Sequence, residues 1–306
     1  MRIVFIGAVE FSRRCLAQVI RCGGNVVAVF GLDSVRSARH GDYADIGPLA
    51  EQYGLPFQHV TNINSPTAIE AVRQAQPDVV FVFGWSQLIG AEIRAVAPCV
   101  GSHPAMLPLN RGRHPVIWAL AEGLAESGLT FFYLDEGADS GDILWQRPFV
   151  ISEEDDAGSL LEKISQFAEQ AIGEFLPQIS AGTGLRRPQN HQIASYWRKR
   201  TAADGEIDWR NDAQTIHNLV RALTHPYPGA TAGIGGEQLT IWKTSLTSRT
   251  GGGEPGRILA RTPLGWKVAT GTGTIEIVVA SGPDLSAGLR FDLRRELPLP
   301  SSRETK

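Results

Sequence analysis

The chain has 306 residues, of which 42% are hydrophobic and 20% are charged, a composition typical of a globular protein with a buried core. Lys and Arg total 29 against 32 Asp and Glu, which gives a net charge of −3. This balance speaks against a protein that binds nucleic acid or an anionic membrane through a basic face. Every apolar run is shorter than the roughly 20 residues that cross a bilayer.

The three cysteines, Cys15, Cys22 and Cys99, contain no CxxC pair. They predict neither a disulfide framework nor a zinc site, and they indicate that the protein is located in a reducing compartment. The N-terminal stretch MRIVFIGAVEF is too short, and too soon interrupted by charge, to be a signal peptide. We expect a soluble, cytoplasmic protein.

Short apolar runs alternate with helical patterns through the first two hundred residues. The expected strands are 3–7, 26–30 and 78–83, and the expected helices are 11–20, 46–53 and 67–76. Strands that are apolar on both faces and separated by helices indicate a parallel sheet covered on both sides. The predicted fold is a doubly wound, mostly parallel, Rossmann-like α/β domain. Its first strand ends at Gly7 without a GxGxxG motif, so no dinucleotide site is predicted.

The last third of the chain has a different pattern. After a helix expected at 157–180, residues 186–203 carry five positive charges and no acid, which favours a solvated linker over a polyanion site. A helix at 213–223 and strand-like runs separated by glycine-rich turns then predict a small β-barrel or sandwich. The expected division is a catalytic domain at 1–185, a linker at 186–203 and a small β-barrel-like domain at 204–306.

The residues best suited to chemistry lie between 101 and 146. His103 follows an apolar run, and an imidazole at the carboxyl end of a parallel strand lies where α/β proteins place their ligands. A second strand at 130–134 leads into an acid-rich loop at 135–142. We expect both strands to end at one rim of the sheet, where a carboxylate can orient the imidazole and raise its basicity.

The same residues are compatible with two further roles. His103 can be an ordinary loop histidine beside a turn rich in Asp and Gly. A metal site built from His103, His114 and the acids is a weaker alternative, because neither HxH nor HExxH spacing is present. The prediction is acid–base chemistry without a metal.

The sequence HPAMLPLNRGRHPVIWAL at 103–120, followed by DEGADSGDIL at 135–144, resembles the signature of the formyltransferase family that uses N10-formyltetrahydrofolate. That family includes methionyl-tRNA formyltransferase and nucleotide-sugar N-formyltransferases. The resemblance extends to IVFIGAVEFS at 3–12, FGWSQLI at 83–89 and the stretch 204–230, and so covers nearly the whole chain. It implies an enzyme that moves a formyl group from N10-formyltetrahydrofolate to an amine.

By this resemblance, His103 takes or relays the proton of the attacking amine and polarises the developing oxyanion. Asp139 holds the imidazole and helps to move protons to the departing N10. Folate is expected to lie over FGWSQLI and the acidic loop, with its pterin held by main-chain groups near Gln87 to Ile89. The expected folate-binding residues are Trp85, Gln87, Leu88, Ile89, Glu136, Gly137, Ala138, Gly141 and Asp142.

One position departs from the family pattern, which has an Asn two residues before the His as a donor to the oxyanion. Gly101 stands there in this sequence. Either Asn110, Ser102 or a main-chain N–H supplies the donor, or the activity is weakened or altered; Ser102 should point to the other face of a regular strand. Loss of one such donor typically costs about 10² to 10³ in rate.

The charge distribution favours a small acceptor. The tRNA enzymes of the family typically carry a long basic loop after the second strand, whereas residues 31–50 hold two Arg, one His and three Asp. Residues 203–306 hold 12 Lys and Arg against 11 Asp and Glu, without the positive excess that a polyanion partner requires. The acceptor expected is the amine of a nucleotide-linked amino sugar.

The expected acceptor-binding residues are Glu10, Ser12, Arg111, Arg113 and His114. An arginine pair can hold a diphosphate by bidentate hydrogen bonds, and an internal clamp onto the acidic loop is the alternative for both arginines. The alternative functions are methionyl-tRNA formylation, formylation of another small amine of secondary metabolism, and a catalytically silent folate- or nucleotide-binding module. A homodimer is compatible with the resemblance.

Overall fold

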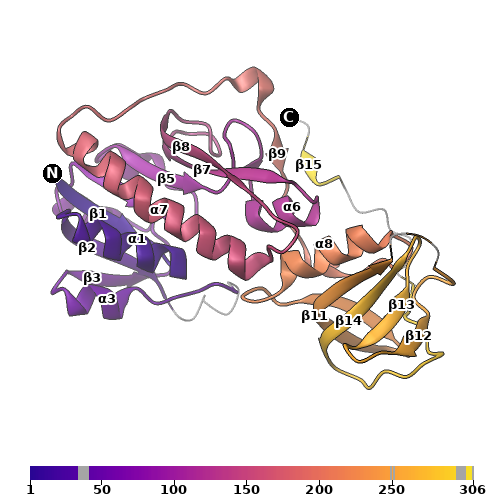
Figure 1. The fold of residues 1–306 in the computed structure, drawn as a ribbon. Helices are drawn as coiled ribbons and strands as arrows, with labels where there is room; N and C mark the ends of the chain where they lie inside the picture. The colour runs from indigo at the N-terminus through magenta and orange to yellow at the C-terminus, as the bar shows by residue number, and fades with distance from the viewer. Residues whose placement is uncertain (34–40, 249, 251, 294–300, 305–306) are drawn as a thin grey trace.

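A seven-stranded sheet forms the centre of the N-terminal domain in the computed structural model, which describes residues 1–33, 41–248, 250, 252–293 and 301–304. Its strand order is β3-β2-β1-β4-β5-β7-β8 (Figure 1). The strands are β1 Arg2–Ile6, β2 Asn25–Leu32, β3 Phe57–Val60, β4 Val79–Val82, β5 Cys99–His103, β7 Glu126–Tyr133 and β8 Ile143–Val150. Strands β1 to β5 pair in parallel, whereas β7 pairs antiparallel with β5 and β8 pairs antiparallel with β7. The predicted, mostly parallel α/β sheet is confirmed.

Helices cover both faces of this sheet, as its two-sided apolar strands require. They are α1 Glu10–Arg21, α3 Gly47–Gln52, α4 Pro66–Gln74, α5 Ala91–Arg94, α6 Pro115–Ala121 and α7 Ala157–Ser180. Helices α1 and α7 lie over one face (Figure 1). There Phe81 of β4 meets Phe175 of α7, with 6.1 Å between the ring centroids. Its neighbour Val80 faces the other way and joins the core around Ile69 of α4.

The C-terminal domain is an antiparallel sheet with one helix packed on it. In spatial order its strands are β10 Ala230–Ile234, β11 Glu237–Ser248, β14 Thr274–Ser281, β13 Trp266–Ala269 and β12 Ile258–Arg261, and the helix is α8 Ala213–Leu223. Helix α8 begins after Asp212, whose carboxylate accepts a hydrogen bond from the Thr215 N–H at 2.9 Å. Ile216 of α8 shares a hydrophobic core with Ile241 and Ile275 of the sheet. The helix and strands predicted for this part are confirmed.

The segment 186–203 lies along the N-terminal domain and contains its own short elements. These elements are η1 His191–Ile193, β9 Tyr196–Trp197 and η2 Ala202–Gly205, the last of which extends beyond residue 203. Two further short strands lie elsewhere in the sequence, β6 Arg111–Gly112 and β15 Arg303–Glu304. Strand β9 pairs with β6 on one side and with β15 on the other. Arg198 is buried in an ion pair with Asp204, so the expectation of a solvated basic stretch is wrong for this residue. The boundaries at 185 and 204 stay predictions.

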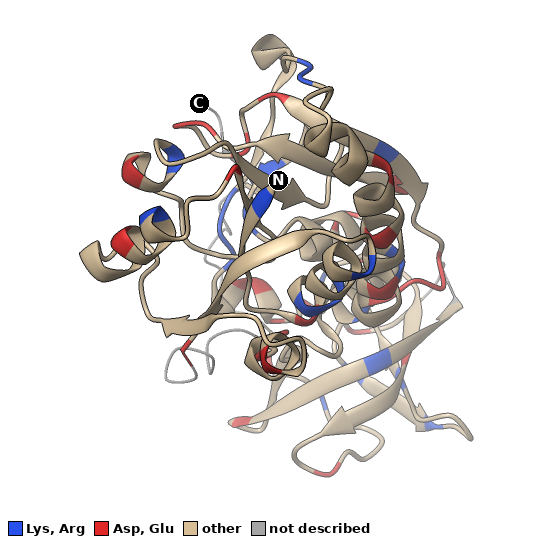
Figure 2. Cartoon of the chain, turned by 90° about the vertical axis from the view of Figure 1, so that its left-hand side faces the viewer, with Lys and Arg blue, Asp and Glu red and all other residues tan. Residues whose placement is uncertain are grey.

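Basic and acidic residues are interspersed along the ribbon (Figure 2). Within the described residues, no helix combines the length and the apolar character that crossing a membrane requires. Of residues 31–50, where the tRNA enzymes carry their basic loop, 34–40 lie outside the described residues. The charge comparison for that stretch therefore rests on the sequence alone.

Candidate active site

His103 ends β5, and only 4% of its surface is exposed. Its Nε2 lies 2.7 Å from the main-chain oxygen of Asn110. Because a carbonyl oxygen only accepts hydrogen bonds, Nε2 carries the proton in this contact. Nδ1 faces the carboxylate of Asp139, with 3.6 Å between Nδ1 and Oδ2. The structure thus brings together the imidazole and the acid that the sequence singled out.

Asp139 reaches His103 by a route that the sequence did not predict. Strand β7 is antiparallel to β5, with His103 opposite Thr130, so the two strands do not end at one rim and that expectation was wrong. The acidic loop begins beside the start of β5, where the Leu134 N–H donates to the Cys99 oxygen at 2.8 Å, and it returns along the sheet to His103. Asp139 has a left-handed backbone (φ 54°), and its Oδ2 accepts a hydrogen bond from the Gly112 N–H at 2.8 Å.

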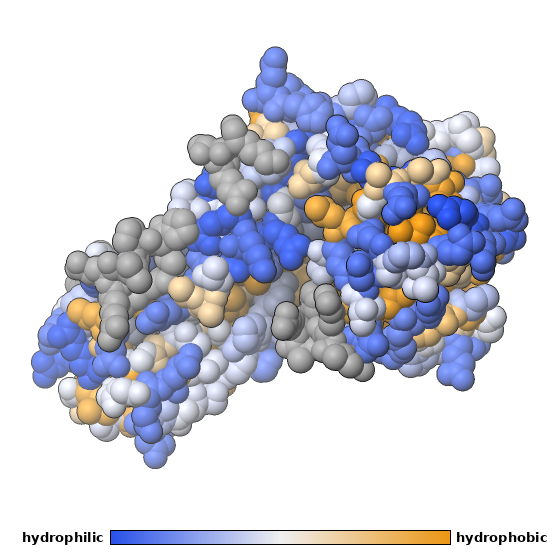
Figure 3. Space-filling model, turned by 180° about the vertical axis from the view of Figure 1, so that it is seen from behind, coloured by the Kyte–Doolittle hydropathy of each residue, from blue (hydrophilic) through white to orange (hydrophobic). Residues whose placement is uncertain are grey.

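A cavity of about 980 Å³ opens beside His103 and Asp139. Its apolar wall includes Val82, Phe132 and Leu134. Two of these, Val82 and Leu134, belong to the core on the side of the sheet away from α7. Figure 3 shows the molecule from behind, and apolar surface gathers there on the larger domain between polar areas. The volume is within the range of small-molecule binding sites.

Most of the expected folate-binding residues border this cavity, namely Trp85, Gln87, Leu88, Ile89, Glu136, Gly137 and Ala138. Gly141 and Asp142 lie outside its described lining. A Cβ on Gly141 would approach the Tyr133 oxygen to 1.9 Å, and the Asp142 oxygen accepts a hydrogen bond from the Tyr133 N–H at 2.8 Å. Gly141 and Asp142 therefore pack against Tyr133 at the end of β7 and do not contact the cavity.

The FGWSQLI segment is fixed from behind by the loop that follows β3. The Gln87 amide donates to the Thr61 oxygen at 2.9 Å and accepts from the Ile63 N–H at 3.1 Å. Asn64 accepts from the Gly90 N–H at 2.7 Å and donates to the Leu88 oxygen at 2.8 Å. The side chain of Gln87 is therefore used inside the protein, and the segment borders the cavity on a rigid support.

The candidates for the oxyanion donor separate clearly. Gly101 and Ser102 border the cavity. Asn110 instead lies outside the described lining; its Oδ1 accepts from the Ser195 hydroxyl at 3.3 Å, and its N–H donates to the same hydroxyl at 2.8 Å. Asn110 serves the site through its main-chain oxygen, which holds His103.

Arg113 and His114 border the cavity, and Lys199 joins them from the segment after the larger domain. Arg113 donates to the Ser86 oxygen at 2.7 Å, and His114 Nδ1 accepts from the Arg200 N–H at 3.1 Å. Burial, together with the nearby positive charges of Arg113, Arg200 and Lys199, lowers the pKa of His114 to about 4. Sequence reasoning missed Lys199 because it assigned the basic run 186–203 to a linker; that run was itself the available signal.

The other expected acceptor residues have interior or surface partners outside the described lining. Ser12 is fully buried, and its hydroxyl donates to the Phe83 oxygen at 2.6 Å. Glu10 is exposed and pairs with Arg13. Arg111 is 1% exposed and bonds to side chains of the 186–203 segment, so this arginine is held inside the protein, although not by the acidic loop as the alternative expected. Among the described residues, no three His, Cys, Asp or Glu side chains gather in a way that could hold a metal ion.

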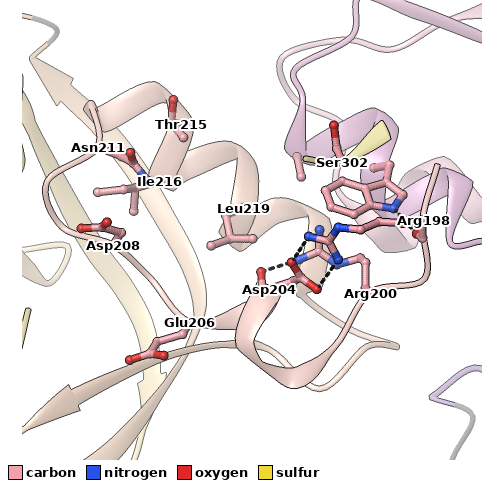
Figure 4. Close-up of a pocket in the computed structure, with 12 residues that line it drawn as sticks. Arg198, Arg200, Asp204, Glu206, Asp208, Asn211, Thr215, Ile216, Leu219 and Ser302 are labelled. Carbon is pink, nitrogen blue, oxygen red and sulfur yellow. Dashed lines mark hydrogen bonds and ion pairs between the residues drawn. The ribbon is translucent and has the colours of Figure 1, made fainter. Parts of the chain in front are cut away.

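A second, smaller cavity of about 230 Å³ lies at the junction of the two domains (Figure 4). Its lining includes Trp118 and Arg198 on one side and Leu219 of α8 on the other. The Arg198 guanidinium is paired with Asp204, and the Trp118 indole donates to the Arg198 oxygen at 3.0 Å. The polar groups of Trp118, Arg198 and Asp204 thus bond to one another at this junction.

The structure combines an α/β domain with a buried imidazole–carboxylate pair that faces a cavity of small-molecule size. Residues 1–176 match the family model described as formyl transferase, and residues 199–284 match the model described as formyl transferase, C-terminal domain. The chain belongs to the formyl transferase family.

Solved structures share this fold at low sequence identity. An N-formyltransferase from Helicobacter canadensis, in complex with folinic acid and dTDP-3-aminofucose, is 17% identical with a TM-score of 0.70, and 90% of this chain covers 98% of it. Methionyl-tRNA formyltransferase from Clostridium thermocellum is 18% identical with a TM-score of 0.60, over 81% of this chain and 94% of that one. HypX from Aquifex aeolicus, in complex with tetrahydrofolic acid, is 20% identical with a TM-score of 0.66 over 90% of this chain. This chain spans only 43% of HypX.

Proposed function

We propose that this chain transfers a formyl group from N10-formyltetrahydrofolate to the amine of a nucleotide-linked amino sugar. The observation that carries the proposal is the buried His103–Asp139 pair beside a cavity of about 980 Å³. A histidine paired with a carboxylate is suited to the proton transfers that amide formation requires.

The residues of the cavity fit a folate. Trp85 lines it, and the indole Nε1 of this residue is buried without a hydrogen-bond partner among the described groups, so an acceptor atom on a ligand would satisfy it. Val82, Phe132 and Leu134 offer apolar surface to a flat ring system. When bound, N10-formyltetrahydrofolate supplies the formyl carbon that the amine attacks.

His103 is placed to take the proton that the amine loses on bonding to the formyl carbon. With the Nε2 proton held by the Asn110 oxygen, Nδ1 is the ring atom that accepts. The resulting imidazolium lies beside the Asp139 carboxylate, which stabilises its charge. The same proton then passes to N10 as the bond between N10 and the formyl carbon breaks, so the protein gains and loses no net proton.

The negative charge that develops on the formyl oxygen needs a hydrogen-bond donor. Asn110 lies outside the described cavity lining, and Gly101 has no side chain. Ser102 borders the cavity next to His103, but it lies opposite Phe131 of the α7-side core, so its side chain faces away from the cavity wall at Phe132. Main-chain N–H groups take the donor role in the proposal.

Positive charge in the lining of the cavity supports a phosphorylated acceptor. Arg113 and Lys199 border the cavity together with His114, and cationic side chains of this kind bind phosphate oxygens. The Helicobacter canadensis relative, whose structure holds dTDP-3-aminofucose, supports the same class of acceptor. The near balance of 29 Lys and Arg against 32 Asp and Glu favours it over tRNA.

The test is incubation of the purified protein with N10-formyltetrahydrofolate and a panel of acceptors, followed by product mass and tetrahydrofolate release. The panel holds several nucleotide-linked amino sugars, hydroxyornithine and charged initiator tRNA. A gain of one formyl mass on a sugar, lost in His103→Ala and retained in His59→Ala, supports the proposal. His59 is an exposed residue on β3 and serves as the matched control.

The other outcomes each contradict a defined part. Formylation of tRNA alone refutes the sugar acceptor and leaves the chemistry of His103 standing. Formylation of hydroxyornithine alone does the same. If N10-formyltetrahydrofolate does not bind at all, the assignment of the cavity to a folate is wrong.

A further inference from the structure

Gln189 lies outside the cavity lining and uses both ends of its amide at the catalytic centre. It is 6% exposed. Its Nε2 donates to two main-chain oxygens of the acidic loop, Asp139 at 2.9 Å and Gly141 at 2.7 Å. Its Oε1 accepts from the guanidinium of Arg111, at 2.7 Å from Nη2 and 3.2 Å from Nε. The side chain therefore connects the acidic loop to strand β6.

The main chain of residues 110–112, which includes strand β6, contacts both members of the catalytic pair. The oxygen of Asn110, just before the strand, holds His103 Nε2 at 2.7 Å. The N–H of Gly112 holds Asp139 Oδ2 at 2.8 Å. Arg111 stands between these two residues and is 1% exposed. Gln189 thus ties the residue at the centre of this stretch to the main chain of Asp139.

The acidic loop needs such a support because its conformation is an unfavourable one. Asp139 is left-handed at φ 54°, which costs energy in a residue with a side chain and persists only where surrounding contacts enforce it. The oxygens of Asp139 and Gly141 would also lose their donor without the Gln189 amide, and a buried acceptor without a partner is costly.

We infer that Gln189 is a positioning residue, which sets the distance between the Asp139 carboxylate and the His103 imidazole. The inference rests on the roles proposed above for these two residues. Since Gln189 is outside the described cavity lining, its loss misplaces the acid without removing a contact to either substrate. Misplacement of about 1 Å in a catalytic group can cost about 10²-fold in rate.

The first experiment replaces Gln189 by Met, which has a similar shape and no amide. Gln189→Met lowers kcat roughly 10- to 100-fold and changes the KM of donor and acceptor by less than about threefold. Gln192→Met is the matched control, because Gln192 lies exposed on η1 in the same segment. An unchanged kcat in Gln189→Met overturns the inference.

A double-mutant cycle separates positioning from a general effect on the fold. In an Asp139→Asn background the acid to be positioned is gone, so Gln189→Met costs less than about threefold there. The same loss in both backgrounds shows that Gln189 does not act through Asp139, and the inference fails.

A second variant, Gln189→Glu, keeps the acceptor for Arg111 and removes the donor to the two main-chain oxygens. We expect it to lose kcat as Gln189→Met does; full activity in Gln189→Glu also overturns the inference. This variant decides the point if Gln189→Met does not fold.

NMR of His103 tests the role of Gln189 without any formyl transfer, so its result does not depend on whether the proposed function is right. The ¹⁵N chemical shifts of the His103 ring, assigned with His103→Ala, are measured in the wild type and both Met variants at one pH. A change of the Nδ1 shift in Gln189→Met and not in Gln192→Met supports positioning, even if the wild type transfers formyl to no acceptor. Identical spectra in all three proteins overturn it, whatever the activity.

Discussion

Leu134 occupies the space into which a side chain at Gly101 would project. A Cβ built on Gly101 lies 2.6 Å from Leu134 Cδ2 and 3.4 Å from Phe132 Cζ. The wall of the cavity beside His103 is therefore closed by an apolar side chain from the start of the acidic loop, and Gly101 leaves no gap. Gly101, which departs from the family pattern, therefore packs directly against Leu134, which precedes the loop that carries Asp139.

This relationship predicts the behaviour of an asparagine at position 101. Gly101→Asn alone overpacks the wall and costs about 1 to 3 kcal/mol of stability. Gly101→Asn with Leu134→Ala has room for the amide, which then donates to the formyl oxygen, so kcat exceeds that of Leu134→Ala alone by up to about 10²-fold. Steady-state kinetics and urea unfolding check the two parts.

The control for this pair is Gly101→Ala with Leu134→Ala, which restores bulk without a donor. A rise in kcat that the alanine pair reproduces would come from packing, and a donor role for the asparagine would then be excluded.

A second prediction concerns the charge of Asp139. Asp139→Asn keeps the size of the side chain and an oxygen that can accept from the Gly112 N–H, but it removes the negative charge beside His103 Nδ1. We expect kcat to fall about 10²- to 10⁴-fold with little change in thermal stability. Formyl transfer kinetics and a thermal melt measure both.

Asp135→Asn is the matched control in the same loop. The Asp135 carboxylate accepts from the Gly137 N–H at 3.0 Å and the Ser140 hydroxyl at 2.6 Å, contacts that hold the loop and do not involve His103. An equal loss of kcat in both variants would mean that the loop, and not the charge of Asp139, is what catalysis depends on.

The parallel half of the larger sheet could be predicted because its strands are apolar on both faces. Phe81 and Val80 illustrate this, since neighbouring residues of β4 enter cores on opposite sides. The direction of β7 could not be predicted, because an antiparallel strand buried on both faces gives the same apolar run. The pairing of His103 with Asp139 was nevertheless found, because the resemblance to the family motif named Asp139, although the strand direction that was expected to bring the acids to His103 was wrong.

The acceptor side of the site was harder to predict, because burial decides which arginine is available. Arg111 and Arg113 are two residues apart, yet Arg111 is 1% exposed and its guanidinium bonds to Gln189. Arg113 is exposed and borders the cavity. Lys199 and Gln189 are far from the motif in sequence, and only the packing of the 186–203 segment brings them to it.

A third prediction follows from the lowered pKa of His114. Burial and the neighbouring cations lower this pKa from 6.5 to about 4. The unfolded chain therefore binds a proton at higher pH than the folded protein does, and stability falls as the pH drops from above 6.5 towards 4. His114→Asn removes this titration, while Asn tolerates the left-handed backbone of φ 57° and can accept from the Arg200 N–H.

We expect the wild type to lose on the order of 2 kcal/mol more than His114→Asn between pH 7 and pH 4.5. Urea unfolding at a series of pH values measures it, with His59→Asn on β3 as the parallel control. Parallel curves for the wild type and His114→Asn would show that His114 is protonated equally in the folded and unfolded states.

The last prediction concerns the ion pair that joins the two domains (Figure 4). The side chain of Asp204 is 2% exposed and that of Arg198 10%. Burial raises the pKa of Asp204, but hydrogen bonds from Arg198 and Thr201 outweigh it and lower the pKa below its usual range. Asp204→Asn leaves the Arg198 guanidinium buried without a charged partner, which costs about 3 to 5 kcal/mol of unfolding free energy.

Since the pKa of Asp204 is lower in the folded protein, its contribution to stability is complete above the unfolded value of 3.8 and is lost as the pH falls through the folded value. The stability difference between the wild type and Asp204→Asn should therefore be constant from pH 7 to pH 5 and should narrow below pH 4. Asp208→Asn is the control, because Asp208 pairs with the more exposed Arg210 and such a pair contributes about 0 to 1 kcal/mol. Equal losses in Asp204→Asn and Asp208→Asn would mean that burial gives the Asp204–Arg198 pair no special role in holding the domains together.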